Sequence, residues 1–172
     1  MYAVVMTASA VQTSFTGLRV RLASPKSYED LVEALLDDVG TDPVPINELG
    51  DRFDGWEDYE RAVQSHVGPS GFMLFATFDH SGWIPKAGVH RKVMRVIIGN
   101  PLIAITMLRH DVTSGLFVPV ELLVTDDPDG GSALTYVVPS SLMVVEENEP
   151  LNAAALALDA KLAALATKVT TG

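Results

Sequence analysis

The sequence predicts an α+β fold in which one mainly antiparallel sheet carries helices packed on one face. Three observations lead to this fold class. Strand-like segments follow one another in neighbouring pairs, as in antiparallel hairpins, and segments with helical spacing separate the pairs. The first strand alternates apolar and charged side chains, which is typical of a sheet with one solvated face. The expected order of elements is β-α-(α)-β-β-α-β-β-α.

The first part of the chain predicts one strand and two helices. Residues 15–24 form the alternating strand, and a capping-box-like pair beginning at Ser27 starts a helix that Gly40 ends. Residues 41–54 hold two prolines, a glycine and several acids, so we interpret them as a connection. Residues 56–67 place apolar side chains at helical spacing and predict a short second helix.

The rest of the chain predicts four strands and two helices. The helix that begins at Pro101 is apolar nearly all round, which predicts burial on several sides. Asn100 can cap this helix, and Pro101 suits its first position. Pro119, inside the third of these strands, indicates an edge or a bulge. The expected ranges are strands 72–80 and 93–98, helix 101–110, strands 115–127 and 131–139, and helix 149–169.

Length and composition restrict the classes of protein that fit. The 172 residues, 48% of them hydrophobic, suit one folded domain over 14–170, preceded by an extension or edge strand over 1–13. Cysteine is absent, which excludes disulfides and thiolate chemistry and fits the cytoplasm. A net charge of −10 disfavours nucleic acid and anionic membranes as partners, although the cations between Lys86 and Arg95 would be the patch that a nucleic acid needs. No apolar run reaches the ~20 residues of a membrane span.

Four motifs in this order resemble the family known as domain of unknown function 302: GFMLFATFDHSG, IIGNPLIAITMLRHD, GLFVPVELLVTDD and LTYVVPSSL. The family's Asp-His pair matches Asp79-His80, and its Gly-Asn-Pro turn matches Gly99 to Pro101. Residues 102–111 match a branch that continues to Arg-His-Asp, and Tyr136 matches a later tyrosine. The resemblance covers roughly residues 71–142. It implies a curved antiparallel sheet of the TATA-binding-protein-like kind, often dimeric, and it implies no established activity.

Two polar motifs supply the candidate catalytic residues. Asp79 and His80 end a strand, and Arg109, His110 and Asp111 end a helix. We expect His80 or His110 to act as a base, Asp79 to orient it, and Arg109 to bind a substrate oxyanion. Because both motifs lie at element ends, we predict that they meet in one site. The alternative is structural: Asp79 caps a turn, and the helix end is a capping and ion-pair network.

The ligand-binding candidates combine this arginine with a capping residue and several large side chains. Aromatic and methionine residues can line an apolar cavity between sheet and helix, or can simply form the core. The Gly-Asn-Pro turn offers a positive helix end for an anion, or is simply a tight turn. Trp83 lies in a loop that is not a hallmark of the family. The cavity candidates are Phe72, Phe75, Phe78, Phe117, Met73 and Met107, and the predicted ligand-binding set is Arg109, Asn100, Trp83, Tyr136, Phe78 and Met107.

These observations favour a small-molecule-binding protein with an apolar cavity and a polar rim. If it is an enzyme, the expected chemistry is a cofactor-independent acid–base step of the isomerase, lyase or cyclase type. No metal site is expected, because the four histidines lack ligand spacing and only a spatial cluster of Asp79, His80 and His110 would provide one. The alternative function is a non-catalytic, homodimeric module that binds a ligand or a partner, with a structural Arg-His-Asp motif.

Overall fold

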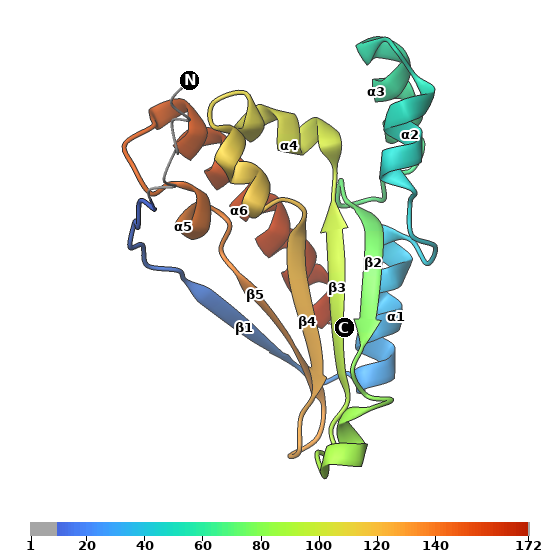
Figure 1. The fold of residues 1–172 in the computed structure, drawn as a ribbon. Helices are drawn as coiled ribbons and strands as arrows, with labels where there is room; N and C mark the ends of the chain where they lie inside the picture. Colours follow the sequence, from blue (N-terminus) through green and yellow to red (C-terminus); the bar gives the residue numbers. More distant parts are fainter. Residues whose placement is uncertain (1–9, 172) are drawn as a thin grey trace, which may run out of the picture.

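The computed structural model describes residues 10–171, which form an α+β fold around a five-stranded antiparallel sheet (Figure 1). The predicted fold class and order of elements are confirmed, with short helices added. The elements are β1 (Arg19–Ser24), α1 (Tyr28–Val39), α2 (Ile46–Arg52), α3 (Trp56–Gln64), β2 (Met73–Asp79), the 3₁₀ helix η1 (Ile84–Ala87), β3 (Val93–Gly99), α4 (Pro101–Leu108), the 3₁₀ helix η2 (Val112–Leu116), β4 (Val120–Asp126), β5 (Ser132–Val137), α5 (Ser140–Met143) and α6 (Glu149–Thr170).

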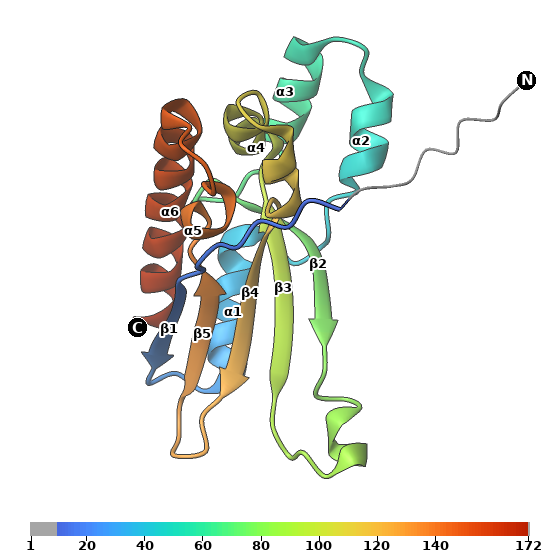
Figure 2. The ribbon, with the colours of Figure 1, turned by 60° about the vertical axis from the view of Figure 1, so that its left-hand side comes forward.

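The sheet has the strand order β1-β5-β4-β3-β2, and every pair of neighbours is antiparallel. Helices α1 and α6 cover one face, as Figures 1 and 2 show from two directions. The main core lies between them and the sheet, where Val96 and Leu134 pack with Leu35 and Leu162. The predicted α6 stripe is confirmed, because Leu151, Ala155, Leu158, Leu162, Leu165 and Val169 are all buried.

The upper and lower ends of the sheet are defined by the β2–β3 pair. Met73 pairs with Gly99 at the upper end, and Asp79 pairs with Met94 at the lower end. Helix α4 lies across the upper end, with the hairpin of α2 and α3 beside it (Figure 1). The β2–β3 connection with η1 and the β4–β5 turn project from the lower end (Figure 2).

Three local expectations were wrong. The connection over 41–54 contains α2, because Leu49 is buried against Val63 and Met73 in a small second core. The strand expected over 115–127 begins only at Val120, after a 3₁₀ turn and a cis Val118–Pro119 peptide. Contacts with distant parts of the chain determine both the helix α2 and the late start of β4. Local sequence propensity does not indicate such contacts.

The third error concerns α4, whose all-apolar sequence predicted burial on several sides. Only Met107 of this helix is fully buried, and Leu102, Ile103, Ile105 and Leu108 are half-buried. The apolar side chains of α4 therefore exceed what the fold itself covers.

Residues 10–18 form no strand, and the rest of the extension predicted over 1–13 lies outside the described residues.

Within residues 10–171, the structure has no helix with both the length and the apolar character to cross a membrane.

Candidate functional site

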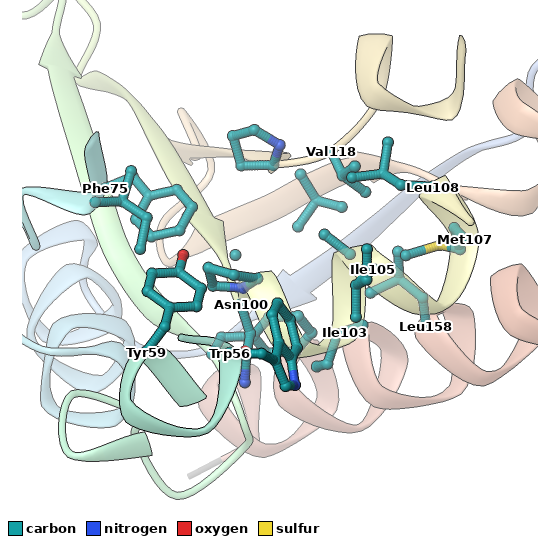
Figure 3. A pocket seen from close by; sticks show the side chains of 17 residues that line it. Trp56, Tyr59, Phe75, Asn100, Ile103, Ile105, Met107, Leu108, Val118 and Leu158 are labelled. Carbon is teal, nitrogen blue, oxygen red and sulfur yellow. The ribbon is translucent and has the colours of Figure 1, made fainter. Parts of the chain in front are cut away.

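An apolar cleft of about 290 Å³ opens between α3, α4 and the loop that enters β4. Trp56 and Tyr59 come from α3, and Ala104, Ile105 and Leu108 come from α4. Figure 3 shows Tyr59 and Phe75 on one side and Leu108 and Val118 on the other. The lining also includes Phe72, Met107, Val120 and Leu158, which are buried residues of the main core.

A β-bulge places Phe75 in the wall of the cleft. Leu74 pairs with Ile98 and Ala76 pairs with Ile97, so Phe75 is the extra residue on β2. Bulges turn a side chain away from the regular alternation of the strand. The ring lies over Gly99, where an added Cβ would come within 2.7 Å of Phe75 Cε2. Glycine at this position therefore makes room for the aromatic wall.

Asn100 organises the start of α4 and leaves it no free donor. Its Oδ1 accepts a hydrogen bond from the Leu102 N–H at 2.8 Å, and its carbonyl accepts from Ile103 and Ala104. Pro101 has no N–H, and Asn100 Nδ2 donates to the Gly71 carbonyl at 2.9 Å. An anion at this helix end would have no donor available. The tight-turn interpretation of the Gly-Asn-Pro motif thus fits the structure better than anion binding.

The cleft is almost free of polar and charged groups. No charged side chain lines it, and Tyr59 is the only titratable residue among the described lining residues. Burial raises the pKa of Tyr59, so its phenol is neutral at pH 7. The indole of Trp56, whose side chain is about half exposed, is a second hydrogen-bond donor at the wall. The cleft offers apolar contact and few hydrogen bonds.

The lower end of the sheet holds the Asp-His motif in a set of local hydrogen bonds. Asp79 Oδ1 accepts from the Ser81 N–H at 2.8 Å, and hydrogen bonds from Ser81, the side chain first, lower the pKa of Asp79. Trp83 Nε1 donates to His80 Nδ1 at 3.2 Å. Asp79 therefore caps the turn after β2, and Trp83 rather than Asp79 orients the imidazole.

The prediction that the two polar motifs meet in one site was wrong. Asp79 lies at the lower end of the sheet, whereas Gly99 leads into α4 at the upper end. Six residue steps along β2 separate these ends, and at about 3.3 Å per residue the separation is about 20 Å. His80 and His110 lie at opposite ends of the sheet. The predicted catalytic site, with a histidine base near Asp79 and Arg109, is therefore not assembled, and Asp79, His80 and His110 do not form the spatial cluster that a metal site would need.

The Arg-His-Asp motif ends α4 at the upper end. Asp111 Oδ1 accepts from both the N–H and the hydroxyl of Thr113, which lowers the pKa of Asp111 and starts η2. The structural alternative for this motif is thus supported as to capping, but Asp111 makes no ion pair within residues 10–171. Arg109 and His110 are exposed, and Arg109 Nε donates to the Ile105 carbonyl at 3.1 Å.

The predicted ligand-binding residues divide between several places. Asn100 and Met107 line the cleft. Tyr136 is 7% exposed and belongs to the core, where burial raises its pKa. Phe78 and Trp83 are exposed away from the cleft, Phe78 on β2 and Trp83 in the loop after it. The cavity candidates divide in the same way: Phe72 and Phe75 line the cleft, whereas Phe117 and Met73 do not.

A model of the family described as Domain of unknown function DUF302 matches residues 52–169, which is more than half of the chain. The chain belongs to this family. Among solved structures it is similar to an uncharacterized conserved DUF302 protein from Bacillus stearothermophilus, with a TM-score of 0.63 and 16% sequence identity. That likeness covers 88% of this chain and 98% of the other, and it shows the fold. None of the curated proteins compared with this DUF302 chain matches it.

Sequence reasoning missed most of the cleft in this DUF302 chain. Trp56 and Tyr59 stood three residues apart on a predicted helix, but nothing local indicated that they face α4. Ile105 and Leu108 were assigned to a buried helix. One feature of the sequence could have indicated the cleft: α4 has apolar side chains on nearly all its sides, which is more than a helix packed on one side of a fold buries.

Proposed function

We propose that this protein binds a small, predominantly apolar molecule in the cleft between α3 and α4. One observation carries the proposal: α4 is apolar nearly all round, yet Met107 alone among its residues is fully buried. Its half-buried Ile105 and Leu108 border a cleft of about 290 Å³. Apolar surface left uncovered around a concave site is the usual mark of a ligand site.

The size of the cleft limits the ligand. Typical small-molecule pockets have roughly 300–1,000 Å³, so a cleft of about 290 Å³ lies at the small end. At about 30 Å³ for a water-sized group, it accommodates on the order of ten non-hydrogen atoms. The absence of charged lining residues favours a neutral, apolar part of the ligand. Tyr59 and Trp56 are available for one or two hydrogen bonds.

Binding alone is better supported than an acid–base reaction in this cleft. The raised pKa of Tyr59 makes its phenol a poor base at neutral pH. The histidines expected to act as bases do not line the cleft. Homodimerisation stays a prediction from the family resemblance.

A series of primary alcohols from 1-butanol to 1-decanol tests the proposal. Each buried methylene contributes about 0.8 kcal/mol, so Kd should fall about fourfold per carbon until the cleft is full. The fluorescence of Trp56 reports binding in a Trp83→Phe background, because the chain has only these two tryptophans. A Kd that does not depend on chain length, or the lack of any saturable response, would contradict the proposal.

A further inference from the structure

We infer that the ligand is an amphiphile whose apolar tail occupies the cleft and whose carboxylate pairs with Arg109. This inference rests on the proposed function and adds the chemical class of the head group. The cleft itself has no charge to hold an ionised group, so such a group must lie at the rim. Arg109 is the cation that directly follows the cleft-lining part of α4.

The position of Arg109 is set by α4. It follows Leu108, and its Nε donates to the Ile105 carbonyl at 3.1 Å. Leu108 and Ile105 both line the cleft, so the hydrogen bond ties the Arg109 side chain to the backbone of a cleft-lining residue, although Arg109 itself is not part of the lining. This hydrogen bond uses one donor of the five and restricts the side chain before any ligand arrives. The restriction lowers the entropy cost of binding.

The terminal amino groups of Arg109 have no partner within residues 10–171. Four other arginines make ion pairs: Arg21 with Asp127, Arg61 with Asp58, Arg91 with Asp126 and Arg95 with Glu121. Asp111 lies two residues from Arg109 but accepts hydrogen bonds from Thr113 instead. Arg19 and Arg52 make no ion pair either, but of these three only Arg109 stands next to a cleft-lining residue in the sequence. The fork of donors remains open for an external anion.

A carboxylate fits this arrangement better than a more highly charged group. The planar guanidinium matches the two oxygens of a carboxylate in a bidentate pair. A net charge of −10 repels anions, and the repulsion grows with the charge of the ligand. At physiological salt the repulsion is screened beyond roughly 8 Å, whereas a direct contact with Arg109 is much shorter. A monoanion therefore gains most from the contact and loses least to the repulsion.

The test compares octanoate with 1-octanol, which share the tail and differ in the head group. Titrations monitored by Trp56 fluorescence in the Trp83→Phe protein at pH 7 give both Kd values. Octanoate should bind about threefold more tightly, the size expected of an exposed ion pair. Arg109→Gln should remove this preference and leave the Kd of 1-octanol unchanged. His110→Gln changes the neighbouring exposed residue and should retain the preference.

The outcomes separate this inference from the proposed function. Equal Kd values for octanoate and 1-octanol, or a preference that survives Arg109→Gln, would overturn the role of Arg109 and leave the cleft as an apolar site. A loss of the preference in His110→Gln as well would also overturn it, because a general effect of local charge or structure would then explain the result. Failure of both molecules to bind would overturn the proposed function itself. Tighter binding of octyl phosphate than of octanoate would contradict the choice of a monoanion.

Discussion

The two ends of the sheet differ in which groups are left without partners. At the lower end the Asp-His motif and a neighbouring lysine are engaged: Asp79 with Ser81, His80 with Trp83, and Lys92 with Glu29. At the upper end the polar side chains of the α4 turn, Asn100 and Asp111, are engaged too, but apolar side chains border open space. The Asp-His cluster at the lower end therefore serves local structure. At the upper end the groups left without partners are the apolar lining of the cleft and the terminal amino groups of Arg109.

The largest expected effect tests the contrast inside α4 itself. Met107→Ala should lower the free energy of unfolding by about 2–5 kcal/mol, because it removes a fully buried side chain from the main core. Ile105→Ala, the matched change at a half-buried residue of the same helix, should cost clearly less. Urea unfolding measures both. Equal losses would show that the two residues are packed alike and would contradict the difference in burial within α4.

Filling the cleft should separate binding from stability. Ala104→Phe places a ring in the cleft and should weaken 1-octanol binding more than tenfold, since displacing two methylenes costs about 1.6 kcal/mol. The urea midpoint should change little. His80→Ala at the lower end is the control and should bind 1-octanol like the wild type. Weaker binding of 1-octanol by His80→Ala would place the ligand contact at the lower end of the sheet and would contradict binding in the cleft.

The two capping acids should give smaller, pH-dependent effects of the same sign at both ends. Hydrogen bonds, from Ser81 to Asp79 and from Thr113 to Asp111, lower each pKa below its ordinary value of 3.8. A lowered folded pKa stabilises the protein above the unfolded pKa, and this contribution is lost as the pH falls through the folded pKa. Asp79→Asn and Asp111→Asn should therefore lower the urea midpoint at pH 7. The difference from the wild type should shrink towards pH 2, and a difference that grows on acidification would contradict the capping roles.

The smallest effect is expected for Trp83→Phe at the lower end. The Trp83 side chain is 55% exposed, and the change removes only its hydrogen bond to His80. Exposed substitutions of this kind usually change the free energy of unfolding by about 0.5 kcal/mol or less. Octanol binding, followed by calorimetry, should match that of the wild type. Loss of binding would show that the exposed tryptophan, rather than the cleft, holds the ligand.

The sequence predicted the fold better than the site, for physical reasons. The stripe of α6 and the alternation of β1 are periodic signals of which face is buried, and both were confirmed. The bulge at Phe75 and the approach of Trp56 to α4 depend on contacts between distant segments. Asp79 and His110 could not be placed without the antiparallel pairing of β2 and β3, which sends the two motifs to opposite ends.

The position of β1 at the edge has a consequence for synthesis of the chain. Within residues 10–171 its only partner is β5, with Arg19 opposite Val137, so β1 must wait for a partner that is synthesised much later. During this wait Val20 and Leu22 have no sheet to join, whereas β2, β3, β4 and β5 each emerge next to a partner or soon after one. Arg19 and Arg21 alternate with these apolar residues. Charges in such positions oppose pairing with other chains. The two arginines should therefore disfavour aggregation of β1 before β5 is available, in addition to solvating the surface of the folded protein.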